Sequence, residues 1–247
     1  MTVTSIVIGV GAGAAIAGRP TEPDPFRLTV APTTSTRAGT PPDISASTTT
    51  TARPEVQWVA IGDSYTGGSL MGGDGAANWA NVVQGYLDRD TYRIPWSVDA
   101  GGGSGYTQGG TRGLTFLDLV DEAVTGNDDI VVIFGSRNDD DPAAVDEASI
   151  KVFARVRELA PSAQLLVIGP AWVNENVPAS ILGIRDALER NASAVGAAFL
   201  DPIADRWFFG PDAALIGSDG VHPTDAGHEY MALRILPAIE ALFPDPA

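Results

Sequence analysis

The feature that most constrains the fold is an alternation, from residue 55 onward, of short apolar segments with longer segments of helical periodicity. Short, β-rich apolar runs such as VQWVAIG at 56–62 and DIVVIF at 129–134 predict buried strands. Buried strands separated by helices indicate a parallel sheet covered on both faces. We predict strands at 56–62, 92–98, 129–134, 164–168 and 197–200, and helices at 78–87, 114–124, 142–159, 178–195 and 224–242.

The second predicted strand, 92–98, is the weakest of the five because it contains Pro95. Proline cannot donate to a β-ladder, so we place this strand near an edge of the sheet. In open parallel sheets, ligands bind outside the carboxyl ends of the strands. Residues that carry out chemistry should therefore lie just after the predicted strands.

The first 54 residues differ in composition from the rest. Residues 5–17 (SIVIGVGAGAAIA) form an apolar run too short to span a bilayer, but typical of a signal-peptide core with an A-x-A cleavage site at 15–17. No Lys or Arg precedes it, so an unexported tail is the alternative. Thr, Pro, Ser and Ala dominate 19–54 without apolar periodicity. We expect a signal-peptide-like segment at 1–18, a disordered linker at 19–54, one folded domain at 55–247, and a secreted or cell-surface location outside a bacterial cytoplasm.

The charge and the rarer residue types exclude several classes of function. The chain has 31 acidic and 15 basic residues, a net charge of −16, and no Lys/Arg cluster, so we expect no nucleic-acid partner. The absence of cysteine excludes disulfides, thiolate catalysis and cysteine-based metal sites. His222 and His228 are the only histidines, so a histidine base must be one of these two.

Two sequence blocks follow the first two predicted strands. The first, Ile61-Gly62-Asp63-Ser64-Tyr65, places a serine at a strand-to-helix turn, where its hydroxyl is exposed and needs only a base to become a nucleophile. By itself this serine is equally compatible with an ordinary turn. The second block, DAGGGSGYTQGG at 99–110, is rich in glycine. It is either a flexible loop, a phosphate-binding loop that lacks the usual partners, or a source of a backbone N–H for an oxyanion.

Of the two further blocks, the third follows the third predicted strand and the fourth precedes the last predicted helix. In Gly135-Ser136-Arg137-Asn138-Asp139 the Asn138 amide is placed to donate to an oxyanion; alternatively Asn138 and Asp139 cap the helix predicted at 142. In DGVHPT at 219–224, Asp219 stands three residues before His222 and can orient its imidazole; alternatively this is a surface turn before a helix. His228 lies inside the predicted last helix, where packing is the favoured role, and nothing around it suggests a metal site.

Together and in this order, the four blocks resemble the SGNH, or GDSL, hydrolase family over residues 55–243. The resemblance implies an α/β fold: a three-layer α/β/α sandwich with a flavodoxin-like, parallel five-stranded sheet. It also implies ester hydrolysis through an acyl-enzyme, without cofactor or metal. Within that resemblance Ser64 is the nucleophile and first oxyanion donor, and Asn138 is the side-chain donor. His222 is the general base and then the acid, oriented by Asp219.

The glycine-rich block and the third block leave two points open. Ser-Gly-Tyr at 104–106 is similar to the family's S-G-x pattern, so we choose Gly105 as the backbone oxyanion donor, with Gly103 as the alternative. The family's third block is often G-x-N-D, whereas Ser136 stands two residues before Asn138 here. This departure concerns the path of the loop rather than the role of Asn138.

The resemblance favours a secreted serine esterase or lipase that acts on lipids or small acyl esters. The alternative is a carbohydrate acetyl esterase, for which Trp172 and Trp207 would stack on sugar rings if they do not simply pack in the core or at its rim. A non-catalytic surface module that has kept the fold is a third, less favoured hypothesis. We expect small-molecule, lipid or acylated-carbohydrate substrates, no nucleic acid, no stable membrane span and a monomer.

Overall fold

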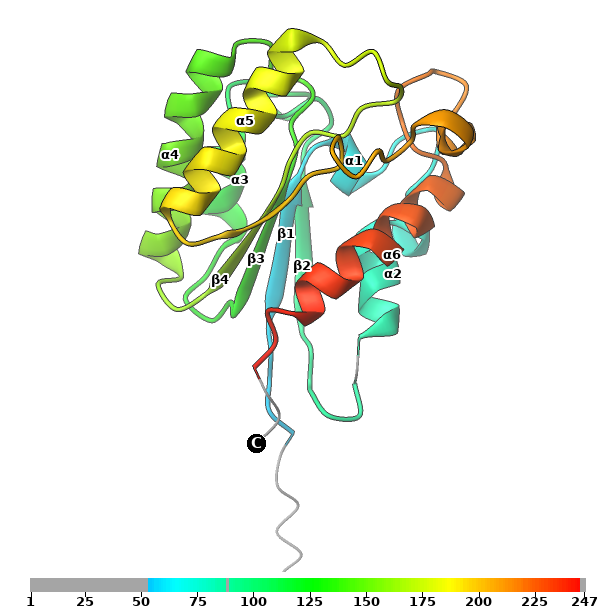
Figure 1. Ribbon diagram of the computed structural model, residues 1–247. Helices are drawn as coiled ribbons and strands as arrows, with labels where there is room; N and C mark the ends of the chain where they lie inside the picture. The colour runs from blue at the N-terminus through cyan, green and yellow to red at the C-terminus, as the bar shows by residue number, and fades with distance from the viewer. Residues whose placement is uncertain (1–52, 88, 245–247) are drawn as a thin grey trace, which may run out of the picture. The chain divides into compact units, whose positions relative to one another are not determined.

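The computed structural model describes residues 53–87 and 89–244 (Figure 1). The signal-peptide-like segment at 1–18 and nearly all of the linker at 19–54 lie outside these described residues, so their assignments stay predictions. Within the described part, Pro54 is already tied to the domain, because its carbonyl accepts a hydrogen bond of 2.9 Å from the N–H of Arg93.

The centre of the domain is a five-stranded sheet in the order β2-β1-β3-β4-β5, and every neighbouring pair is parallel. The order confirms the predicted parallel sheet. It also confirms that the second strand is at an edge, where the missing N–H of Pro95 is tolerated. The strands are β1 (Trp58–Gly62), β2 (Trp96–Ala100), β3 (Ile130–Phe134), β4 (Gln164–Ile168) and β5 (Ala198–Leu200).

Helices cover both faces of the sheet, as Figure 1 shows, so the fold is a three-layer α/β/α sandwich. Successive strand residues point to opposite faces: Val59 and Ile61 pack on the side of α3, α4 and α5, whereas Trp58 and Ala60 pack on the side of α2 and α6. The helices are α1 (Ser64–Gly67), α2 (Trp79–Tyr86), α3 (Phe116–Ala123), α4 (Pro142–Leu159), α5 (Ala179–Ala194) and α6 (Asp225–Glu240).

The structure differs from the predicted elements in the short ones. Strand β2 begins only after Pro95, four residues later than predicted. The helix α1 and two 3₁₀ helices, Gly75–Ala77 and Gly210–Leu215, were not predicted. A segment of three to six residues cannot display a 3.6-residue period, so hydrophobic spacing gives no signal for it.

The register of the strands brings the loops of the first three blocks together. Gly62, the last residue of β1, pairs with Ala100 on one side and with Phe134 on the other, and each of these also ends its strand. The loops after β1, β2 and β3 therefore leave the sheet side by side at its carboxyl edge. Among the described residues no helix is long and apolar enough to cross a bilayer.

Candidate active site

Ser64 is the first residue of α1, directly after the turn that ends β1. The turn needs glycine at position 62, because a Cβ there would overlap Thr66 Oγ1 and lie 2.8 Å from the carbonyl oxygen of Phe134. The Asp63 side chain caps the helix by accepting a hydrogen bond of 2.8 Å from Tyr65 N–H. The N–H of Ser64 is in the first turn of the helix and has no acceptor within the helix. The turn thus presents the hydroxyl and the N–H of the same serine.

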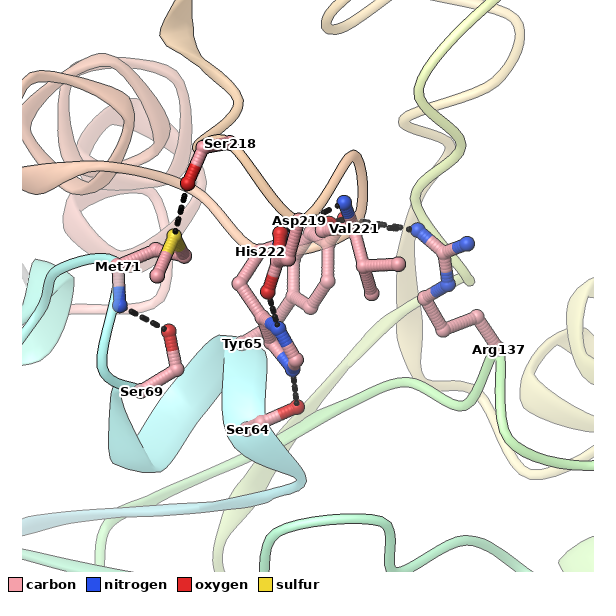
Figure 2. A network of polar contacts seen from close by, with 9 residues as sticks. All are labelled: Ser64, Tyr65, Ser69, Met71, Arg137, Ser218, Asp219, Val221 and His222. Atoms are coloured by element: carbon pink, nitrogen blue, oxygen red, sulfur yellow. Dashed lines mark hydrogen bonds and ion pairs between the residues drawn. The ribbon is translucent and has the colours of Figure 1, made fainter.

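The turn at 217–223 places His222 against Ser64 (Figure 2). Nε2 of His222 lies 2.9 Å from Ser64 Oγ, and Nδ1 lies 2.6 Å from Oδ2 of Asp219. The other oxygen of Asp219 accepts from the backbone N–H groups of Val221 and His222, both at 2.9 Å. One carboxylate therefore shapes the turn and holds the imidazole.

The charge state of Asp219 determines which nitrogen of His222 carries the proton. Hydrogen bonds from the backbone and ring of His222 and from Val221 N–H lower the pKa of Asp219 from 3.8 to about 2. The carboxylate is therefore ionised at neutral pH and can only accept. It follows that Nδ1 of the neutral imidazole carries its proton, and Nε2 is left as the acceptor for the hydroxyl of Ser64.

Asn138 reaches the same place from the loop after β3. Its Nδ2 donates to Oδ2 of Asp63 at 3.0 Å and to the carbonyl of Ser104 at 2.8 Å. The alternative that Asn138 and Asp139 cap α4 is wrong, because Asp141 accepts the N–H of Ala143 there. The serine of the atypical third block, Ser136, is buried, and its Oγ accepts the N–H of Asn138 at 2.9 Å.

Asp139 supports the glycine-rich loop rather than a helix. Its carboxylate accepts from the N–H of Tyr106 and from the N–H and hydroxyl of Thr107, at 2.6–2.9 Å. From the sequence, Asp139 is expected to have no role except as the alternative cap of the helix. A carboxylate that follows the asparagine and faces a loop far away in the sequence leaves no local pattern, so only the fold reveals this contact.

The structure does not bring Gly105 into the site. Its N–H donates to the carbonyl of Gln108 at 2.9 Å, and the residue is buried beside Asp139 and Ser136. Gly103 lies instead in the wall of the cavity that contains Ser64, with φ at +76°, a backbone conformation suited to glycine. The choice of Gly105 therefore does not fit this loop, because the tight turn at 105–108 uses its N–H internally.

The cavity above Ser64 has a volume of about 610 Å³. Its walls come from the blocks after β1, β2 and β3, from the turn that carries His222, and from the segment 68–71. Leu70 in that segment is fully exposed, and Met71 beside it lies against Gly217. A second cavity, of about 650 Å³, lies along the same segment near Asp74 and Asp225, and Ser64, His222 and Asp219 do not line it.

His228 is fully buried in α6 and does not line the cavity of Ser64. Its Nδ1 lies 3.3 Å from Trp79 N–H, which can donate to it. Burial lowers the pKa of His228 from 6.5 to about 4, so the ring is neutral at pH 7. A Cβ at Gly73 would overlap Nε2 of this ring, which shows how closely the backbone packs on it. Packing is therefore the role that its position supports.

Of the two tryptophans considered for sugar stacking, Trp207 is fully buried and contacts Phe134, with ring centroids 6.2 Å apart. It is a core residue and cannot stack on a ligand. Trp172 is half-buried and carries the guanidinium of Arg137 over its ring at 4.4 Å. Within residues 53–87 and 89–244, no group of three His, Asp or Glu side chains is arranged to hold a metal ion.

Comparisons with known proteins show which family and fold this chain shares. Residues 60–230 match the model of the GDSL-like lipase/acylhydrolase family. The chain is 47% identical over 184 residues to the GDSL lipase Rv0518 of Mycobacterium tuberculosis, covering 72% of this chain and 79% of that protein. Among solved structures, TesA matches with a TM-score of 0.61 at 19% identity, covering 76% of this chain and 99% of TesA. Est24, a carbohydrate acetylesterase from Sinorhizobium meliloti, matches with a TM-score of 0.58 at 16% identity, covering 76% of this chain and all of Est24.

The two solved structures share the fold, while the family model and the mycobacterial relative cover most of the described domain. The chain therefore belongs to the SGNH/GDSL hydrolase family and is a carboxylic ester hydrolase.

Proposed function

We propose that the protein hydrolyses carboxylic esters with Ser64 as nucleophile, His222 as base and Asp219 as the group that orients the base. The observation that carries this proposal is the continuous chain of contacts from Asp219 through His222 to Ser64, at 2.6 and 2.9 Å. A serine hydroxyl with such a partner loses its proton to Nε2 as it attacks a carbonyl.

The reaction has two steps. In the first, Ser64 Oγ forms a bond to the ester carbonyl carbon, His222 takes the hydroxyl proton, and the alcohol leaves with that proton. In the second, water attacks the acyl-enzyme, His222 takes a proton from the water and returns it to Ser64, and the carboxylic acid leaves. Asp219 stays ionised throughout and stabilises the imidazolium formed in each step.

Each step passes through a tetrahedral intermediate with a negatively charged oxygen, the oxyanion. Hydrogen-bond donors from three loops are available to stabilise it. We assign the N–H of Ser64, the N–H of Gly103 and the Nδ2 of Asn138. Gly103 lines the cavity of Ser64, whereas the N–H of Gly105 is bonded to Gln108. Asn138 already donates to Asp63 and Ser104, so one of these bonds is shared or released when the oxyanion forms. Each such donor contributes about 2.7–4 kcal/mol to lowering the barrier.

For the substrate we favour lipid or small acyl esters over acetylated carbohydrate. Leu70 is fully exposed at the rim of the cavity above Ser64, and Met71 lines the same wall. An acyl chain that is bound to Ser64 and extends along this wall would contact apolar atoms. Trp207 does not offer a sugar platform, because it is buried. The 47% identical relative is itself named a lipase, which agrees with this choice.

The decisive experiment replaces Ser64 with alanine in the full chain. The variant is expected to fold with an unchanged circular dichroism spectrum and to lose hydrolysis of p-nitrophenyl acetate and butyrate. A fluorophosphonate probe should label the unmodified protein at Ser64 and not label the variant. Retained hydrolysis in Ser64→Ala would refute the assignment.

A series of esters separates the two substrate classes. Rising kcat/KM from acetate to longer p-nitrophenyl esters supports acyl-lipid substrates, because each additional buried CH₂ contributes about 0.8 kcal/mol. A preference for acetate on sugars supports the carbohydrate acetyl esterase instead. Leu70→Ser should reduce the gain with chain length and leave acetate hydrolysis unchanged, with Leu233→Ser on the exposed side of α6 as the matched control.

We also propose that the enzyme is exported, on the basis of the apolar run at 5–17 and its A-x-A site. The full chain should accumulate esterase activity outside a producing bacterial cell. A chain that lacks 5–17 should keep its activity inside. Equal distribution of the two proteins would contradict export through this segment.

A further inference from the structure

Tyr65 and Arg137, two residues next to the proposed machinery, are joined to the turn that carries His222. The hydroxyl of Tyr65 donates to the carbonyl oxygen of Val221 at 2.5 Å. The guanidinium of Arg137 donates to the same hydroxyl at 3.0 Å and approaches the Val221 carbonyl at 3.5 Å. Val221 directly precedes His222 in the sequence. Figure 2 shows Arg137 in contact with Val221, beside the chain of contacts from Asp219 through His222 to Ser64.

The two side chains are themselves held in place. The Tyr65 ring is buried edge-on against Phe134 and Phe208, with centroids 6.1 and 6.4 Å away. The guanidinium of Arg137 lies over Trp172, 4.4 Å from the ring centroid, and 5.8 Å from that of Tyr65. A planar cation between two aromatic rings keeps a fixed orientation. Both side chains are therefore packed against groups that lie outside the turn at 217–223.

Apart from these bonds, the turn at 217–223 has few contacts that hold it in position over Ser64. Its internal hydrogen bonds, such as Gly217 N–H to the His222 carbonyl and Val221 N–H to Asp219, give it shape but do not tie it to the sheet. Met71 touches its first residues on the far side, at Gly217 and Ser218. Besides the contact of His222 with Ser64 and the contact of Ser218 Oγ with Met71 Sδ, the Val221 carbonyl bonds the turn to Tyr65 after β1 and Arg137 after β3.

We propose that Tyr65 and Arg137 are positioning residues. The Tyr65 hydroxyl and the Arg137 guanidinium form a brace that holds the Val221 carbonyl and thereby keeps Nε2 of His222 within reach of Ser64 Oγ. The inference rests on the proposed function. Because Tyr65 follows Ser64 and Arg137 precedes Asn138, the nucleophile, the oxyanion donor and the base are linked by the side chains of their sequence neighbours. Burial raises the pKa of Tyr65 to about 12, so the hydroxyl keeps its proton at neutral pH.

The experiment is a pair of tyrosine variants in the full chain. Tyr65→Phe removes one hydroxyl from the brace and leaves its ring packed. Tyr92→Phe is the matched control, because the buried Tyr92 also donates to a backbone carbonyl, that of Pro244, at 2.5 Å, before the first residue of β2 and therefore at the opposite end of the sheet from Ser64. Both variants lose a tyrosine hydroxyl that donates to a backbone carbonyl at 2.5 Å, and Tyr65→Phe also loses the bond from Arg137. A loss of activity that comes only from removing such a tyrosine–carbonyl bond should therefore appear in both variants.

We expect Tyr65→Phe to lower kcat on p-nitrophenyl butyrate about 10- to 100-fold while KM changes by less than about twofold, because a displaced base slows the chemical step rather than binding. The rate of labelling by a fluorophosphonate should fall in parallel. Tyr92→Phe should keep both rates. A kcat within about twofold of the unmodified enzyme in Tyr65→Phe, or equal losses in the two variants, would overturn the proposal.

A second variant keeps the test valid if Tyr65→Phe does not fold. Arg137→Met retains an apolar stem over Trp172 and removes the donors, and it is expected to lower kcat without changing KM. If both side chains act through Val221, the loss in the double variant is smaller than the product of the single losses. If the loss of kcat in the double variant equals the product of the two single losses, the proposal that both side chains act through Val221 is wrong. Ser64→Ala is measured in parallel: activity in that variant would refute the proposed function, whereas an inactive Ser64→Ala with a fully active Tyr65→Phe would refute only the brace.

Discussion

The side-chain amide of Asn138 donates to the carboxyl group of Asp63 over 3.0 Å, and Asp63 is the residue that caps the helix of the nucleophile. The two residues come from loops after different strands and are 75 positions apart. Asp63 is almost completely buried. One carboxyl group therefore fixes both the turn of Ser64 and the amide assigned to the oxyanion.

Asp63 should make the stability of the protein decrease as the pH rises. Burial raises its pKa from 3.8 to about 7. Because the folded state binds the proton more tightly than the unfolded state, this contribution is full below about 3.8 and is lost as the pH rises through about 7. The unmodified protein should lose roughly 2–3 kcal/mol relative to Asp63→Asn between pH 5 and pH 8 in urea unfolding. Parallel pH dependence of the two proteins would contradict the raised pKa.

Asp219→Asn should inactivate the enzyme without unfolding it. An asparagine oxygen can still accept the N–H groups of Val221 and His222, but its NH₂ would donate to Nδ1 and so move the imidazole proton to Nε2. We expect kcat/KM on p-nitrophenyl acetate to fall by about 10²- to 10⁴-fold at pH 7.5. Asp205→Asn, at an exposed position, is the control. A loss smaller than about tenfold would show that Asp219 does not orient the base.

The two histidines should respond differently to substitution by glutamine. His222→Gln is expected to abolish ester hydrolysis and fluorophosphonate labelling of Ser64, because no other base reaches the hydroxyl among the described residues. His228→Gln should keep labelling at pH 7 and lower the melting temperature, since the ring is buried and packs against Gly73. Mass spectrometry of the labelled proteins and thermal unfolding measure the two effects. Loss of labelling in His228→Gln with an intact fold would reverse the assignment.

The two glycines of the second block should differ in what a methyl group does to stability. A Cβ at Gly105 would lie 2.5 Å from Oδ2 of Asp139 and 2.7 Å from Oγ of Ser136, so Gly105→Ala should destabilise the fold by roughly 3 kcal/mol. At Gly103 the nearest atom would be 3.5 Å away, and the cost is the strain of a positive φ, about 1–2 kcal/mol. Thermal unfolding should rank the two variants in this order. The opposite order would mean that the loop around Gly105 is more open.

The longer elements of the fold could be predicted from the sequence because their signals are local. A run of apolar residues indicates a strand such as 129–134, and apolar residues at helical spacing indicate a helix such as 142–159, whatever the rest of the chain does. The structure confirmed the parallel sheet and the edge position of the strand after Pro95. It differed in the short elements around the site, where length and glycine content leave no periodic signal.

The sequence by itself determined the fold class, three blocks at strand ends and a fourth before the last helix, and the shortage of histidine bases that points to His222. The tertiary structure alone decided which atoms meet. It placed Gly103 rather than Gly105 in the cavity of Ser64, buried His228, and joined Tyr65 to Val221 across 156 positions. Local patterns depend on a residue's neighbours in the chain. A contact between loops depends instead on strand register and on the path of each turn, which are set when the whole sheet assembles.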